Sequence, residues 1–267
     1  MKSIAVIIHA RTQSTRCPNK HLRDLGDGNT LIDIAINNVN QLNVDEKYLA
    51  VGEEILSERV IGDVKVLDRK FDSVKKGNPP MNIFYKHLEN VKSDFIVNYN
   101  PCQPFLNVKE VQRVIDVFKE CRHDSMITVK KEKNFFWDNI LRPVNFKEGD
   151  RLSTIDGPHL FVATHSLVCF KKQYMLDNWQ YFSNQHNDPF PLEVDWSDEE
   201  LVDVDTELDW SLVRSRYKEG KYNKPWEDFK VKTYGKEKFK FENLKYYNLI
   251  RDVYSRFVGL SYSSSSM

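Results

Sequence analysis

The sequence has little cysteine, and its cysteines are scattered. Its 267 residues include only Cys17, Cys102, Cys121 and Cys169. These four form no CxxC pair and have no metal-ligand spacing, which argues against a zinc ribbon or a disulfide scaffold. The sequence therefore predicts reduced thiols and a cytoplasmic protein.

The chain also lacks net charge and long apolar runs. Lysine plus arginine and aspartate plus glutamate both number 39, so the formal net charge is zero. Nucleic-acid-binding domains usually carry a basic excess, so we expect no nucleic-acid partner. No apolar run is long enough to cross a bilayer, and the run at residues 4–8 is too short for a secretion signal. We expect no membrane partner.

What the sequence does contain is an alternation of apolar runs and helical patterns. Strands are expected at residues 4–8, 48–51, 64–67, 95–99, 126–129, 160–163, 167–170 and 201–204. Helices are expected to begin at Thr30, Asn107 and Thr206, and one is expected over residues 81–91. This alternation predicts an α/β fold of three layers, α/β/α and Rossmann-like, with a mostly parallel central sheet.

Changes in composition divide the chain. Residues 1–213 are expected to form the main domain, and residues 134–158 break the alternation as an excursion from its sheet. Residues 214–260, rich in Lys, Arg, Tyr and Phe, are expected to form a C-terminal extension with a helix at 243–258. Residues 261–267 are of low complexity, and we expect a disordered tail there.

The polar segment after the first strand carries three cations and a hydroxyl. Arg11, Arg16, Lys20 and Ser14 follow a buried strand, which delivers them to the carboxyl edge of the sheet. Guanidinium groups grip paired phosphate oxygens, and an ammonium acts as a mobile point charge. The pattern is typical of a triphosphate pocket, with a solvated basic loop as the alternative. It has no GxxxxGK[ST] and is no Walker A loop.

Two aspartates near residue 204 are candidate metal ligands. Successive strand residues alternate sides, so Asp203 and Asp205 would share one face of a strand end. Two carboxylates on one face suit Mg²⁺, which could bridge to phosphate oxygens. The alternative is that Asp203 is a surface charge. We expect Asp209 to act at the start of the helix that follows Thr206.

The segment Arg11-x-x-Ser14-x-Arg16-x-Pro18-Asn19-Lys20 resembles the signature loop of the cytidylyltransferases that activate acidic sugars, the acylneuraminate and related KDO enzymes. The resemblance implies a GT-A-like nucleotidyltransferase fold. It implies that Arg11, Arg16 and Lys20 are catalytic, and that Ala10 and Ser14 also bind the nucleotide. Thr12 and Gln13 stand where the family has glycines.

Two further segments are similar to this family. Asn100-Pro-Cys102-Gln103-Pro-Phe is similar in place to the family's Gln-Pro-Thr-Ser-Pro-Leu, or Gln-Gly-Asp-Glu-Pro-Leu in the KDO enzymes. This implies nucleotide contact by Asn100 and substrate contact by Gln103. Cys102 stands at the Thr or metal-binding Asp, and a thiol is a poor Mg²⁺ ligand. The run from Asp203 to Asp209 resembles the family's Asp-Ile-Asp-Thr-x-x-Asp, which implies Mg²⁺ on Asp203 and Asp205.

The substrate half of the site has weaker matches. Residues 160–171 resemble the family's strand that ends in Asn-Gly-Ala-Ile-Tyr, which implies sugar contacts for Thr164 and His165. A structural role is the alternative for His165. The excursion carries sugar and dimer contacts in the family, which implies a substrate contact for Arg142 and a homodimer.

The implied function is transfer of CMP from CTP to the hydroxyl of an acidic sugar, such as a sialic-acid-like nonulosonic acid, with release of pyrophosphate. Three alternatives stay open. A GT-A-type glycosyltransferase also uses an Asp-x-Asp metal pair, which Asp203 and Asp205 match. The others are a nucleotidyltransferase with a different acceptor and a non-catalytic nucleotide-binding relative.

Overall fold

The computed structural model describes residues 2–74, 79–147, 149–151, 153, 157–183 and 188–219. All described residues lie in one compact unit, which falls within residues 1–223. The predicted helix at 243–258 and the predicted tail at 261–267 lie outside the described residues. The predicted domain boundary at residue 213 stays a prediction.

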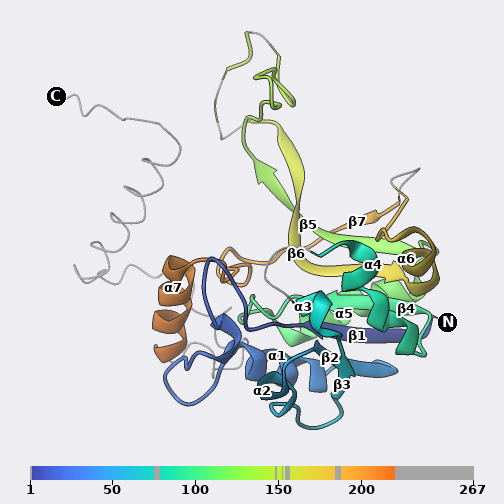
Figure 1. The fold of residues 1–267 in the computed structure, drawn as a ribbon. Coiled ribbons are helices and arrows are strands. Elements are labelled where there is room, and N and C mark those ends of the chain that lie inside the picture. The colour runs from blue at the N-terminus through green and yellow to red at the C-terminus, as the bar shows by residue number, and fades with distance from the viewer. Residues whose placement is uncertain are drawn as a thin grey trace. The chain divides into compact units, whose positions relative to one another are not determined.

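The described residues form one seven-stranded sheet in the order β3-β2-β1-β4-β6-β5-β7 (Figure 1). The strands are β1 (Ile4–His9), β2 (Glu46–Val51), β3 (Lys65–Asp68), β4 (Phe95–Tyr99), β5 (Ser125–Lys133), β6 (His159–Lys171) and β7 (Phe190–Glu193). Only β6 runs antiparallel to its neighbours β4 and β5. The chain fills one side of β1 with β2 and β3 before it returns to the other side with β4. Such a switch in strand order is where open α/β sheets bind ligands.

Helices cover both faces of the sheet. Ile4, Val6 and Ile8 of β1 point to one face, where they pack with α1 (Leu31–Asn40) and α5 (Val108–Glu120). Ala5 and Ile7 point to the other face, where they pack with η2 (Lys86–Asn90) and α6 (Lys172–Asn178). All five side chains are fully buried, as expected of a strand covered on both sides. The predicted three-layer fold is confirmed.

The predicted helix starts are also confirmed. Thr30 and Asp33 form a capping box at α1, and Thr206 and Asp209 form another at α7 (Glu207–Lys218). Asn107 caps α5 by accepting a hydrogen bond from the amide of Lys109. The remaining short helices are η1 (Lys20–Leu22), α2 (Glu54–Ser57), α3 (Phe71–Val74) and α4 (Met81–Phe84).

Three predicted elements differ in the structure. The helix expected over 81–91 is broken into α4 and η2, with Tyr85 between them. The strands expected at 160–163 and 167–170 are one strand, β6, whose register with β5 shifts between Ile127 and Val129. Its His165 has a φ of 56°, a left-handed conformation that absorbs this irregularity.

The prediction of a strand at residues 201–204 was wrong, since no strand forms there. Its apolar residues pack, but the amide of Val204 donates to the carbonyl of Cys102 at 2.9 Å, which lies in a turn. One backbone hydrogen bond to a turn is not the repeated pairing with a neighbouring strand that a β-strand needs. The strand β7 and helix α6 were not predicted.

The strands β5 and β6 continue as a two-stranded ribbon beyond the rest of the sheet (Figure 1). The ribbon pairing extends to Lys133 opposite His159, whereas β4 pairs with β6 only as far as Leu167. Residues 134–158, predicted to leave the sheet, connect the far ends of these two strands.

Candidate functional site

The loop after β1 is shaped by its own polar side chains. The hydroxyl of Ser14 accepts a hydrogen bond from the amide of Cys17 at 3.3 Å. Glu53, just after β2, accepts from both the amide and the hydroxyl of Thr12, at 2.9 and 3.1 Å. Ala10 is buried, and its amide donates to the carbonyl of Ala50. Ser14 and Glu53 thus hold the loop at the carboxyl edge of the sheet.

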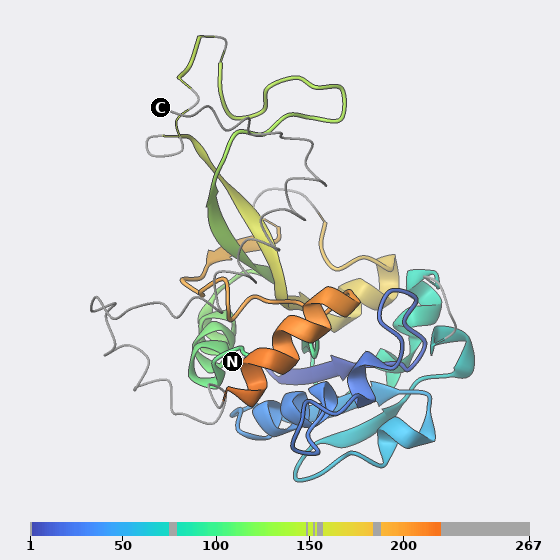
Figure 2. The ribbon, with the colours of Figure 1, turned by 90° about the vertical axis from the view of Figure 1, so that its left-hand side faces the viewer.

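Lys20 joins this loop to the segment that precedes α7. Its buried ammonium donates to the carbonyl of Val204 at 2.5 Å and lies 3.3 Å from Oδ1 of Asp205. Burial opposes the charge of Lys20, but its interactions with Cys102, Asp205 and Asp203 outweigh this effect and raise its pKa. The loop and α7 lie side by side in both views (Figure 1 and Figure 2).

Arg16 reaches the same carboxylate from the solvent side. Its Nη2 atom lies 2.8 Å from Oδ1 of Asp205, and 65% of its side chain is exposed. One oxygen of Asp205 therefore holds two cations of the loop. The structure brings together Arg16, Lys20 and Asp205, which are three of the residues singled out from the sequence.

Asp203 lies beside this cluster but has a different partner. The amide nitrogen Nδ2 of Asn100 donates to Oδ2 of Asp203 at 2.8 Å and to the carbonyl of His165 at 3.2 Å. Burial raises the pKa of Asp203; the charge of Asp205 raises it further, while Asn100, Lys20 and His165 act against the rise. The favourable interactions of the Asp203 carboxylate therefore do not fully offset the cost of burying its negative charge. The side-chain amide of Asn100 is thus engaged by Asp203. Nucleotide contact by Asn100 stays a prediction.

Cys102 lies under the site as a neutral thiol. Burial raises its pKa to about 12, even though the nearby Lys20 lowers it. Its carbonyl accepts from Val204, which fixes the segment that carries Asp203 and Asp205. Cys102 therefore supports this segment and supplies no anionic ligand at neutral pH.

The donor set fits a cation that is shared with a phosphate. Within the part of the chain that the structure describes, no three His, Cys, Asp or Glu side chains gather as a metal cluster. Mg²⁺ usually takes one or two carboxylates and completes its shell with phosphate oxygens and water. Asp203 and Asp205 are the two carboxylates of the site, and they lie close enough for the charge of Asp205 to add to burial in raising the pKa of Asp203. No strand forms at 201–204, so the strand alternation that predicted a shared face does not apply, and Mg²⁺ binding by the pair stays a prediction.

Two predicted substrate residues are buried beneath the site. Gln103 donates to the carbonyl of Thr164 at 3.0 Å, and only 2% of Gln103 is exposed. The hydroxyl of Thr164 lies 2.7 Å from that of Thr128. The bond from Nε2 of Gln103 holds β6 against the turn after β4, whereas Oε1 of Gln103 is buried without a hydrogen-bond partner among the described residues. His165, in contrast, is exposed at the edge of the site. Substrate contact by these three residues stays a prediction.

Arg142 is not part of the cluster. It lies in the excursion, where its Nε donates to Asp138 at 2.7 Å and 73% of its side chain is exposed. The structure gives it no contact with Lys20, Asp203 or Asp205 among the contacts of the described residues. Its predicted role in substrate binding stays a prediction.

Arg69 is a candidate functional residue that the sequence pattern did not reveal. It follows β3, is 2% exposed, and donates to the carbonyl of Ser73 at 2.8 Å. Its guanidinium carbon lies 4.2 Å from the ring centroid of Phe84. Burial lowers its pKa to about 10, with the charge of Tyr85 acting against this and that of Arg11 adding to it. Arg69 is thus a buried cation whose pKa is affected by Arg11 of the loop. Its place just after a predicted parallel strand is the signal that could have found it.

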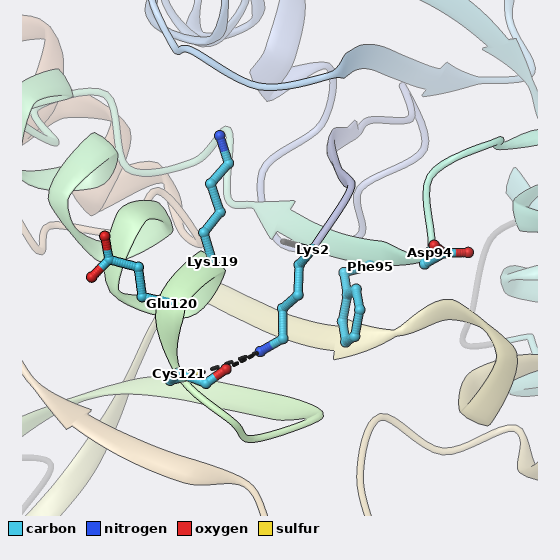
Figure 3. A pocket seen from close by; sticks show the side chains of 6 residues that line it. All are labelled: Lys2, Asp94, Phe95, Lys119, Glu120 and Cys121. Carbon is cyan, nitrogen blue, oxygen red and sulfur yellow. Dashed lines mark hydrogen bonds between the residues drawn. The ribbon is translucent and has the colours of Figure 1, made fainter.

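A cavity of about 620 Å³ lies away from this site, near the amino-terminal end of β1 (Figure 3). Its lining residues are Lys2, Asp94, Phe95, Lys119, Glu120 and Cys121. The ammonium of Lys2 donates to the carbonyls of Phe118, Cys121 and His123, at 2.9, 3.0 and 2.5 Å. Lys2 therefore satisfies the end of α5, and the cavity includes none of the candidate site residues.

No helix in the described ranges is long and apolar enough to span a membrane.

Comparison with known proteins shows which family this chain matches. A family model described as cytidylyltransferase matches residues 5–144, more than half of the chain. The curated relatives include 3-deoxy-manno-octulosonate cytidylyltransferases of Rickettsia bellii, 30% identical, and Rickettsia akari, 28% identical, each over 134 residues. Each match covers 49% of this chain and 53% of the relative, so the chain spans about half the length of these relatives.

Two solved structures share the fold. One is CMP:2-keto-3-deoxy-manno-octonic acid synthetase complexed with CTP, with a TM-score of 0.59 and 13% identity over 82% of this chain and 99% of that one. The other is 4-diphosphocytidyl-2C-methyl-D-erythritol synthase from Anaerococcus prevotii, with a TM-score of 0.56 and 11% identity over 81% and 96% of the two chains. At such identities the likeness concerns the fold alone.

Proposed function

Because this chain belongs to the cytidylyltransferase family, we propose that it transfers CMP from CTP to the hydroxyl of an acidic sugar and releases pyrophosphate. The observation that carries the proposal is the meeting of Arg16 and Lys20 with Asp205 at the carboxyl edge of the sheet. Cations from the loop and carboxylates from the other end of the domain form one cluster there. Such a cluster suits a triphosphate with its counterion.

The proposed reaction is an in-line displacement at the α-phosphorus of CTP. The acceptor hydroxyl attacks, the bond to the bridging oxygen breaks, and pyrophosphate leaves with that oxygen. Arg11, Arg16 and Lys20 hold the β- and γ-phosphates and offset the charge that develops on the leaving pyrophosphate. Catalysis then comes mainly from positioning and electrostatic stabilisation.

Asp203 and Asp205 are the residues that would hold Mg²⁺. When bound, Mg²⁺ supplies positive charge that offsets the phosphate oxygens. Asn100 orients Asp203 through its 2.8 Å hydrogen bond, and Lys20 fixes the Val204 carbonyl between the two carboxylates. Cys102 holds the same segment through its backbone. These contacts hold in place the segment that carries both carboxylates, just before α7.

The proposed acceptor is a 2-keto-3-deoxy sugar acid. The names of the curated relatives give 3-deoxy-manno-octulosonate as their substrate, which supports an eight-carbon acid. A nonulosonic acid of the sialic-acid type has the same reacting hydroxyl beside a carboxylate. His165, exposed next to Asn100 and Asp203, is the proposed contact to the sugar.

We propose further that the protein is a homodimer formed through the β5–β6 ribbon and the excursion. Large apolar side chains are exposed there, namely Trp137, Ile140, Leu141, Val144, Phe161 and Val162. Several exposed apolar side chains in one part of a molecule are typical of an interface.

Pyrophosphate release from CTP tests the proposed function. The acceptor panel contains 3-deoxy-manno-octulosonate, nonulosonic acids and 2C-methyl-D-erythritol 4-phosphate, each with Mg²⁺, and a reaction without acceptor is the control. We expect turnover with one sugar acid and none without an acceptor. Turnover of the phosphorylated polyol alone would contradict the acidic-sugar assignment. Absence of CTP binding would contradict the activity itself, and hydrolysis of a nucleotide sugar would favour a glycosyltransferase.

A further inference from the structure

We infer that Arg23 is a positioning residue of the proposed reaction, because it holds the loop after β1 against α7 through contacts that the nucleotide does not replace. The inference rests on the proposed function, since it concerns the loop that would bind the triphosphate. It goes further because it gives a role to a residue outside the cluster of Arg16, Lys20 and Asp205.

Arg23 bridges the loop and α7. It directly follows η1, and its Nη1 atom lies 2.8 Å from each carboxylate oxygen of Glu207, in the first turn of α7. The same nitrogen lies 3.3 Å from Sγ of Cys17, a fully buried residue of the loop. The guanidinium carbon lies 4.6 Å from the ring centroid of Trp210, which is also buried. One side chain therefore contacts the loop and two successive turns of α7.

Lys20 makes a second bridge from the other end of η1. Its ammonium donates to the carbonyl of Val204 at 2.5 Å and lies 3.3 Å from Oδ1 of Asp205. Residues three apart in a 3₁₀ turn lie on the same side of it, so Lys20 and Arg23 extend together toward the start of α7. This short turn thus holds the carboxylate segment and the helix behind it at two neighbouring places.

The two bridges differ in what the nucleotide does to them. In the proposed reaction, Arg16 and Lys20 turn to phosphate oxygens, which weakens their contacts with Asp205. Arg23 is not among the residues that hold the phosphates, and its Nη1 atom is already engaged by Glu207. The bridge from Arg23 to α7 therefore persists in the nucleotide-bound state. It keeps the cations of the loop in register with the carboxylate segment while Lys20 is occupied.

The far end of α7 has its own attachment to the segment after η1. Nδ2 of Asn29 donates to the hydroxyl of Tyr217 at 3.1 Å, and that hydroxyl donates to Oδ2 of Asp27 at 2.9 Å. The side chains of Trp210, Val213 and Tyr217 are also buried. Removal of the Arg23 guanidinium should therefore loosen the start of α7 without detaching the helix.

Calorimetric titration with CTP and Mg²⁺, together with steady-state kinetics, tests the inference. The variant is Arg23→Met, which keeps an unbranched side chain and removes the charge. We expect its Kd and KM for CTP to rise roughly tenfold, less than the roughly hundredfold loss that a misplacement of about 1 Å can cause. The KM for the acceptor should not change. A purely structural role would reduce the folded fraction, and hence the apparent kcat, without weakening CTP binding by the folded protein.

Arg113→Met is the matched control for Arg23→Met. Nε of Arg113 lies 2.9 Å from Oε2 of Glu110 on α5, and 46% of the Arg113 side chain is exposed, against 32% for Arg23. This control should leave Kd and KM unchanged. Arg23→Lys keeps the positive charge and should restore most of the affinity.

A double-mutant cycle isolates the contact with Glu207. Glu207→Met removes the other partner and should raise the Kd for CTP by a similar factor. The variant with both changes should bind little more weakly than either single variant, because the two side chains act through one contact. Arg23→Gln is a second neutral variant, to be used if Arg23→Met shows no cooperative thermal melt.

The outcomes distinguish the inference from the proposed function. If the neutral variant of Arg23 binds CTP as tightly as the unchanged protein does, the inference is overturned, while CTP binding and turnover by the unchanged protein keep the proposed function intact. Equal losses in Arg23→Met and Arg113→Met would also overturn the inference. If the unchanged protein binds no CTP, both are overturned.

Discussion

Lys20 is a buried ammonium, and two of its hydrogen-bond acceptors lie on the segment that carries Asp205. Replacement by Met keeps the length of the side chain and removes the charge. We expect Lys20→Met to lower kcat/KM for CTP by about 10²- to 10³-fold, the loss typical of one preorganised electrostatic contact. Steady-state pyrophosphate release measures it.

The matched control for Lys20→Met is Lys130→Met, which removes a lysine that pairs with the exposed Asp198 on the sheet. It should retain activity within about twofold, because surface ion pairs contribute little. Equal losses in both variants would mean that Lys20 acts only through the fold.

Buried histidines give a second prediction at this scale. Burial, with Lys20 and Arg11 adding to it, lowers the pKa of His21 to about 3, and burial with Arg69 lowers that of His87 to about 3. The unfolded chain binds protons at both near pH 6.5, whereas the folded chain does not. The free energy of unfolding therefore falls as pH drops from 6.5 toward 3, by about 1.4 kcal/mol per pH unit for each histidine.

Urea unfolding at several pH values checks this dependence. His87→Gln should make the slope below pH 6.5 shallower by about one histidine, that is by about 1.4 kcal/mol per pH unit. His159→Gln, at an exposed position of β6, should leave the slope unchanged. A slope that is the same in His87→Gln and in the unchanged protein would contradict the buried neutral state.

The residues of the site differ in how far the sequence predicted them. Arg16, Lys20 and Asp205 could be named because the loop motif and the paired aspartates are local patterns. Arg69 could not, because its burial depends on Phe84 and Ser73, which only the fold brings over it. The contact between Asn100 and Asp203 spans 103 residues, and no pattern in the sequence indicates it.

At the scale of elements, α7 carries the carboxylate segment at its start. Thr206 accepts from the amide of Asp209, and Asp209 accepts from Thr206 in return. We expect Thr206→Ala to lower the free energy of unfolding by about 1 kcal/mol, the usual contribution of such a cap. Chemical denaturation measures the loss.

Thr206→Ser is the conservative counterpart, since it keeps the hydroxyl and should restore most of that stability. The same capping box holds the amide of Asp205, so Thr206→Ala should also weaken Mg²⁺-dependent CTP binding. If the two variants were equally destabilised, the hydroxyl would not be the source of the effect.

The strands and helices were predictable where a pattern was both local and long. The apolar run at Ile4–His9 is continuous and mostly buried. The capping boxes that begin at Thr30 and Thr206 each depend on only four consecutive residues. β7, in contrast, has only four residues, and its burial alternates between partial and none. The residues at 201–204 have the composition of a strand, but the Val204 amide bonds to the turn after β4, at the Cys102 carbonyl, and these residues join no strand of the sheet.

At the scale of the whole molecule, the proposed dimer gives a further prediction. Ile140 and Leu141 are 63% and 81% exposed at the excursion. We expect the unchanged protein to have the mass of a dimer in light scattering, and the double variant Ile140→Asp and Leu141→Asp to have that of a monomer. Charges placed in an apolar interface oppose its burial.

Ile55→Asp is the control for that experiment, since Ile55 is 56% exposed on α2, on the other side of the sheet order. It should leave the mass unchanged. A monomeric mass for the unchanged protein would remove the proposed interface.

The bond between Lys20 and Val204 has a consequence for biosynthesis. Its two ends are separated by 184 residues, so a nascent chain that has folded β1 and its loop still lacks the carboxylate side of the pocket. Domains form progressively during synthesis, and contacts of long sequence separation form late. The ribosome must therefore release almost all of the described domain before the proposed nucleotide site can form. At the proposed site, nucleotide could then stabilise only chains that have been made beyond Asp205.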